Sequence, residues 1–220
     1  MMHAIATVLY VVIVTVASGL ELGALVKRAR LITDKSFEKA PAACCEGEWS
    51  HWLIEDRLMI GVTPGAEEGA HLDDASARRA LEDAGIDCFA CLDETTEFRD
   101  PGDTANLHLP IAPRRTPDME PFLELLDRCL GHYERGGAAI YMHSSGGRCR
   151  PGLVAACLAA LLRDDVDADS AAVESAALGN GAASILQRRF MESITSSIKT
   201  HRRLLSDQAM ADAGMPRGYL

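Results

Sequence analysis

Short apolar runs alternate along the chain with longer stretches in which apolar residues recur every three or four positions. The short runs predict buried strands, at residues 57–61, 88–92, 107–111 and 138–142. The longer stretches predict helices, at residues 74–84, 116–135 and 152–162. Strands that alternate with helices predict an α/β fold, with a central, mostly parallel sheet of four to five strands flanked by helices.

The N-terminal segment is apolar enough to predict a helix that spans a membrane. No residue from position 4 to 20 is charged, and the run to position 26 has about 20 residues, the length of a bilayer-spanning helix. Basic residues follow at once from Lys27, so the positive-inside rule predicts a single-pass anchor over residues 1–26 with the domain facing the cytoplasm. The small residues at 17–19 leave open a cleaved targeting segment, and hence a secreted or organelle-targeted protein.

The rest of the chain divides by composition into three parts. Residues 27–48 combine mixed charge with a proline and a run of small residues, and predict a linker. Its Cys44–Cys45 pair could accept palmitoyl groups, although an unmodified pair is favoured. Residues 49–205 predict one globular domain, and residues 206–220 predict a loose tail.

Composition narrows the class of function. A formal net charge of −10 argues against a nucleic-acid partner, because DNA and RNA phosphates would be repelled. Seven cysteines without a dense pattern of spacings predict reduced thiols. Cys88 and Cys91 fall within an apolar strand on opposite faces, with no second ligand pair spaced for a metal, so we expect core thiols and neither metal nor cofactor.

The segment 143–152 carries the chemistry that the sequence suggests. It joins a predicted strand to a predicted helix through a glycine-containing loop with arginines. Such a loop can curl its backbone amides into a concave nest, and the helix directs its positive N-terminal end toward the same point. The residues expected to bind an oxyanion are those of this loop: Ser145, Gly146, Gly147, Arg148, Cys149 and Arg150.

This segment resembles the signature of the protein tyrosine and dual-specificity phosphatases, His-Cys-x5-Arg followed by Ser or Thr. It is most similar to the compact dual-specificity-like branch. His143 falls on the motif histidine, Ser144 on the nucleophilic cysteine and Gly147 on the motif glycine. Arg150 falls on the phosphate-binding arginine and Pro151 on the Ser/Thr after it. The resemblance implies the cysteine-phosphatase fold and a phosphate site with His143 in a supporting role.

Other positions carry the same resemblance. Residues 52–61 are similar to the family's first strand, 84–87 to its turn before the next strand, and 109–111 to the strand that leads to the general acid. Gln187 stands where this branch often has a glutamine in its C-terminal helical part.

Three positions depart from the family pattern. Ser144 replaces the cysteine whose thiolate attacks phosphorus, and an alcohol is far less acidic than a thiol. Pro113 stands at the position of the general acid, with Ala112 before it, and neither can donate a proton. Pro151 replaces the hydroxyl that assists release of the thiolate. The joint loss predicts a pseudophosphatase that retains phosphate binding.

Several interpretations remain open from the sequence. Arg114 and Arg115 follow the lost acid and would give the site a basic rim, suited to a phosphorylated protein or to a phosphoinositide or inositol phosphate. A working phosphatase of unusual mechanism would use Ser144 or Cys149, with Asp93, Glu94 or Glu97 as a substitute acid. An interaction module that no longer binds anions is the third reading.

Overall fold

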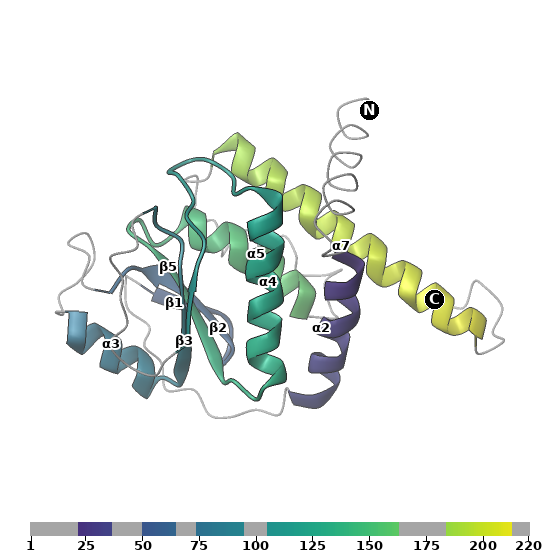
Figure 1. Cartoon of the computed structure of the whole chain (residues 1–220), viewed down its shortest axis with the longest axis horizontal. Coiled ribbons are helices and arrows are strands. Elements are labelled where there is room, and N and C mark those ends of the chain that lie inside the picture. Colours follow the sequence, from purple (N-terminus) through teal and green to yellow (C-terminus); the bar gives the residue numbers. More distant parts are fainter. Residues whose placement is uncertain (1–21, 37–49, 65–73, 95–104, 163–183, 213–220) are drawn as a thin grey trace.

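The computed structural model describes residues 22–36, 50–64, 74–94, 105–162 and 184–212. These residues form a mixed five-stranded sheet with helices on both faces (Figure 1). The expected α/β fold with a mostly parallel sheet is therefore confirmed.

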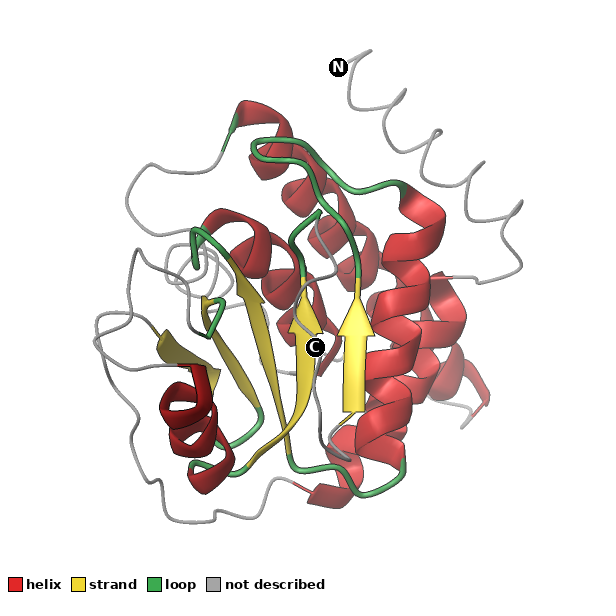
Figure 2. Cartoon of the chain, turned by 60° about the vertical axis from the view of Figure 1, so that its left-hand side comes forward, coloured by secondary structure: helices red, strands yellow, loops and turns green. Residues whose placement is uncertain are grey.

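The sheet has the order β1-β2-β5-β3-β4. Its strands are β1 (Ser50–Ile54), β2 (Leu58–Val62), β3 (Ile86–Cys91), β4 (Ala105–His108) and β5 (Ala139–Ser144). β1 and β2 form an antiparallel hairpin, whereas β2, β5, β3 and β4 are parallel to one another. The carboxyl ends of these four strands consequently lie at one edge of the sheet (Figure 2).

The helices cover the two faces of the sheet unequally. They are α2 (Leu22–Ser36), α3 (Asp74–Asp83), α4 (Met119–Glu134), α5 (Cys149–Leu162) and α7 (Ile185–Asp212). α3 lies alone on one face, and α4 and α5 cover the other, where α2 and α7 form a further layer (Figures 1 and 2). The helices α3 and α4 match the predicted ones closely, and α5 begins three residues earlier than expected.

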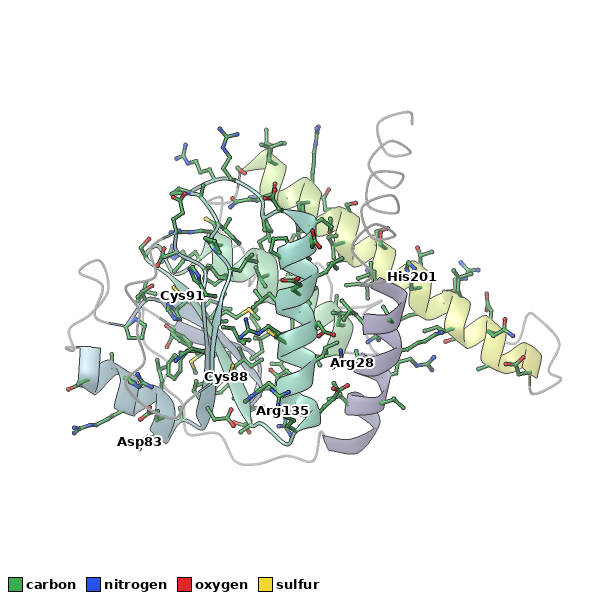
Figure 3. All side chains as sticks on the ribbon, viewed as in Figure 1. Arg28, Asp83, Cys88, Cys91, Arg135 and His201 are labelled. Atoms are coloured by element: carbon green, nitrogen blue, oxygen red, sulfur yellow. The ribbon has the colours of Figure 1, made fainter. Side chains whose placement is uncertain are left out.

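Alternation along the strands builds two cores. In the central strand β5, Ile140 and Met142 face the large core under α4 and α5, while Tyr141 faces the smaller core under α3. Cys88 belongs to the large core and burial raises its thiol pKa to about 12. Figure 3 shows Cys88 and Cys91 along β3 inside the molecule, and both are buried, as expected of core thiols.

The N-terminal part differs from the expected division into anchor and linker. α2 runs through the expected boundary at residue 26, and residues 27–36 are helical. Its apolar positions recur with helical spacing and are buried against α4, α5 and α7: Leu22, Leu25, Val26, Ala29 and Ile32. Arg28, labelled on α2 in Figure 3, forms ion pairs with Asp127 and Glu134 that fix α2 to α4.

The structure describes the two ends of the chain only in part. Residues 1–21 and the Cys44–Cys45 pair lie outside the described residues. Within the described ranges, none of the helices has the length and apolar character needed to cross a bilayer. At the other end, α7 continues to Asp212, so the expected tail from residue 206 is helical in its first part.

Candidate phosphate-binding site

The site lies where three parallel strands end side by side. β5 ends at Ser144, and the loop 145–148 leads directly into α5. Two bonds tie the neighbouring strands to it: the amide of Thr63 donates to the Ser144 carbonyl over 3.0 Å, and the amide of Leu92 donates to the His143 carbonyl over 2.9 Å. The segments after β2, β3 and β5 therefore meet, at the edge where α/β sheets commonly bind ligands.

Gly147 gives the loop its tight curvature. Its φ is +62°, in the left-handed region, and its amide donates to the Ser144 carbonyl over 2.9 Å. A Cβ atom there would lie 2.5 Å from Cγ1 and 2.7 Å from the backbone nitrogen of Val62. Only glycine therefore fits between the loop and β2. Gly146 has no such contact and no positive φ.

Arg150 lies in the first turn of α5 and is buried. Its Nη1 donates to Oδ1 of Asp93 over 2.8 Å and to the Ile111 carbonyl over 3.3 Å. Its Nη2 donates to the hydroxyl of Ser145 over 2.7 Å. Within the described residues, Nε has no hydrogen-bond partner. The guanidinium therefore keeps the N–H of Nε and one N–H of Nη2 for an oxyanion.

Asp93, which follows β3, is the most highly connected side chain of the site. Its carboxylate accepts the amide of Ser145 over 3.0 and 2.8 Å, the Ser145 hydroxyl over 3.0 Å and the Thr63 hydroxyl over 2.8 Å. Burial alone would raise its pKa, but these hydrogen bonds and the charge of Arg150 outweigh burial and lower the pKa. An ionised carboxylate has no proton to donate, which argues against Asp93 as the substitute acid.

Ser144 has no evident activating base. It is 1% exposed, and within the described residues its hydroxyl makes no hydrogen bond. His143 stacks on Tyr141 at 5.6 Å, and its Nδ1 lies 3.0 Å from the hydroxyl of Thr63. Because Thr63 donates to the Asp93 carboxylate, its oxygen accepts from Nδ1–H of the histidine. Burial lowers the His143 pKa to about 3, so the ring is neutral and supports the strand end.

The position expected of the general acid holds no proton donor. Pro113 is exposed in the loop between β4 and α4, and Ala112 beside it is half-buried. Pro151 is buried in the first turn of α5, where backbone amides have no intrahelical partner, so its ring costs no hydrogen bond. The bond from the Gly152 amide to the Arg148 carbonyl, 2.8 Å long, shows that the turn is intact.

The arginine loop is the segment Ala112–Arg115, which α7 holds in place. The hydroxyl of Ser184 donates to the Arg114 carbonyl over 2.9 Å, and Nε2 of Gln187 donates to the Arg115 carbonyl over 3.1 Å. Gln187 is fully buried. Its predicted supporting role thus takes the form of an anchor for this loop, and both arginines are exposed.

Cys149 and Glu94 are the remaining candidates that the structure describes. Cys149 is partly exposed at the start of α5, and Glu94 is exposed beyond Asp93. Glu97 lies outside the described residues. No group of metal-ligating side chains occurs in the part of the chain that the structure describes.

Comparison with known proteins identifies the fold. No family model and no curated protein matches the sequence. Among solved structures, PTPMT1 in complex with PI(5)P has a TM-score of 0.54 at 14% identity, over 70% of this chain and 99% of the other. DUSP15 has a TM-score of 0.54 at 18% identity, over 73% and 97% of the two chains. The chain has the cysteine-phosphatase fold. Kinase-associated phosphatase with its catalytic cysteine substituted by serine has a TM-score of 0.52 at 22% identity, over 64% and 87%.

The structure thus confirms the fold that the signature implied. Placement of the family's individual site positions on Ser144, Pro113 and Arg150 stays a prediction, since identities this low establish the fold alone.

Proposed function

We propose that the chain is a pseudophosphatase, a domain of the phosphatase fold that binds a phosphorylated ligand in the loop 145–150 without hydrolysing it efficiently. The observation that carries the proposal is the hydroxyl of Ser144, which lies below this loop without a hydrogen-bonded base. Unactivated, it stays a protonated and poor nucleophile at neutral pH. The loss of a thiolate also removes a negative charge that would repel a bound phosphate.

The binding half of the proposal is supported by the remaining groups of the loop. Gly147 is in a conformation that curls the chain, and Arg150 retains Nε for a charge-assisted bond. The N-terminal end of α5, a helix of 14 residues, adds a favourable dipole. The ligand class, a phosphorylated protein or an inositol phosphate, is supported by the fold and by the PI(5)P bound to PTPMT1. An N-terminal membrane tether with the domain in the cytoplasm remains part of this proposal.

A turnover assay tests the missing chemistry. The full chain should not release phosphate from p-nitrophenyl phosphate above the level of the Ser144→Ala variant, because both lack a thiolate. Wild-type turnover that disappears in Ser144→Ala would contradict the proposal, whereas turnover that disappears on thiol alkylation would assign the reaction to a cysteine such as Cys149.

A back-mutation series tests whether the loop is intact. Ser144→Cys should gain slow phosphate release, and the addition of Pro113→Asp should increase it, because a thiolate and an acid are then restored. Circular dichroism should show both variants folded. Folded variants without any gain would count against an intact phosphate site.

A second candidate function, an interaction module that binds no anion, is favoured by Asp93. Its carboxylate already accepts the Ser145 amide and pairs with Arg150, two groups that a phosphate would use. In that case Arg150→Ala would leave every ligand-binding and partner-binding assay unchanged. Loss of phosphate binding in Arg150→Ala would reject this second candidate.

A further inference from the structure

Arg114 has a backbone conformation that an arginine rarely adopts. Its φ is +62°, in the left-handed region, where a residue with a side chain costs about 1 kcal/mol or more. The turn is imposed by the bonds described above and by the Arg115 amide, which donates to the Ala112 carbonyl over 3.0 Å. A glycine would take this conformation without strain. An arginine at a strained position of a rigid turn suggests that its side chain is used.

The arginine loop begins beside the phosphate-binding loop. The Ile111 carbonyl accepts from Arg150, so Ile111 touches the guanidinium of the site. Arg114 is three residues further on, and its Cα therefore lies within about 11 Å of the Ile111 Cα. Figures 1 and 2 show this loop and the first turn of α7 together at the end of the molecule where the parallel strands end. The two loops thus belong to one surface.

This surface carries positive charge that the described residues leave unneutralised. Arg150 is paired with Asp93, but the exposed arginines of the two loops and of the start of α7 make no ion pair with a described residue: Arg114, Arg115, Arg148, Arg188 and Arg189. They stand out in a chain with a net charge of −10. A local positive field of this kind attracts ligands that carry several negative charges.

We propose that Arg114 and Arg115 form a second anion subsite, so that the protein binds a small molecule with several closely spaced phosphates. One phosphate occupies the loop 145–150 and another contacts the two arginines. The chemistry is that of an inositol polyphosphate ring, either free or as a lipid headgroup. The inference rests on the proposed function, because the first phosphate needs the loop. The arginine loop, which stands where the family has its general acid, would then be part of the binding surface.

The test compares inorganic phosphate with inositol hexakisphosphate by titration calorimetry on the full chain, at an ionic strength of about 0.15 M, where long-range attraction is screened. Arg114→Gln with Arg115→Gln should weaken hexakisphosphate binding about tenfold or more and change phosphate binding less than about twofold. The matched control is Arg79→Gln with Arg203→Gln, which removes two exposed charges from α3 and from the distant part of α7. This control should bind both ligands like the wild type.

The outcomes separate the subsite from the proposed function. If phosphate binds and depends on Arg150, but the loop variant binds hexakisphosphate no worse than the control, the subsite is overturned and the proposed function stands. If neither anion binds the wild type, or neither depends on Arg150, the proposed function fails and the subsite with it. If a doubly phosphorylated peptide binds more tightly than inositol hexakisphosphate, the proposal that the ligand is a small molecule is overturned.

A second arm identifies the source of the ring. Phosphatidylcholine vesicles with phosphatidylinositol bisphosphate are compared with vesicles of phosphatidylcholine alone, in sedimentation with the same variants. If the ring is a lipid headgroup, adding the inositol lipid should increase vesicle binding less in the double variant Arg114→Gln with Arg115→Gln than in the control. Dependence on Arg114 and Arg115 in solution but not on vesicles would assign the subsite to a free inositol phosphate. Absence of such dependence in both arms would overturn it.

Discussion

Two adjacent glycines in the loop 145–150 are under different steric constraints. Gly147 combines a positive φ with close contact to Val62, whereas Gly146 faces open space. Gly147→Ala should therefore lower the free energy of unfolding by more than about 1 kcal/mol, because the new methyl group displaces β2 or the loop. Urea unfolding measures the change. Gly146→Ala is the matched control and should stay within about 0.5 kcal/mol of the wild type. Equal effects of the two substitutions would show that the loop has another conformation.

Arg114 presents the opposite case, a side chain kept where glycine would be easier. Arg114→Gly should leave the protein as stable as the wild type or more stable by up to about 1 kcal/mol, because it relieves the left-handed strain. The same variant should bind inositol hexakisphosphate less tightly. Thermal unfolding and titration calorimetry on one preparation give both values. A marked loss of stability would mean that the arginine side chain holds the turn instead of a ligand.

At the scale of the elements, α2 is the helix that the sequence interpretation missed. Its first residues continue the apolar N-terminal run, and the charged residues after them have the composition of a linker. In the structure, the buried apolar residues of α2 follow one face of the helix. Val26→Asp should lower the free energy of unfolding by more than about 2 kcal/mol, because it buries a charge in the core.

Leu31 on the same helix provides the control for that prediction. It is 63% exposed, so Leu31→Asp should change the unfolding free energy by less than about 0.5 kcal/mol. Urea unfolding of the full chain compares the two variants. If Val26→Asp is as mild as Leu31→Asp, α2 is not packed against the domain.

Local pattern predicted most elements, and the site only in part. Most strands and helices, and the loop with Gly147 and Arg150, lie where the short-range pattern predicts them. The exceptions among the strands are β4, which covers residues 105–108 and not 107–111, and β1, which was not predicted as a separate strand. The sequence indicates Asp93 only as a possible substitute acid and gives no sign of Thr63, because both lie at the ends of other strands. They reach it only through the strand order in which β5 lies between β2 and β3. Such contacts require the sheet topology, which the residue pattern does not determine.

At the scale of the whole molecule, the buried His143 makes stability depend on pH. Its pKa is about 3 in the folded protein and about 6.5 when exposed, so between these values the unfolded chain binds the additional proton. Stability should fall as the pH decreases from about 6.5, by at most about 1.4 kcal/mol per pH unit from this group. The lowered pKa of Asp93 acts in the same direction, but only at lower pH, near and below the ordinary range of a carboxyl group. Urea unfolding at pH values from about 4.5 to about 7.5 covers the titration of a histidine. The free energy of unfolding should fall with decreasing pH in the wild type and fall less steeply in His143→Gln. An equal slope in both would assign the effect to other groups.

We propose above that the loop 145–150 encloses an oxyanion although no nucleophile lies at its base. A crystal of the full chain soaked in tungstate tests this most directly, since the heavy atom is located by its anomalous signal. We expect tungstate to lie among the amides of the loop, with Nε of Arg150 donating a hydrogen bond to one of its oxygens. A loop without tungstate, in which Asp93 still accepts the Ser145 amide and pairs with Arg150, would contradict it.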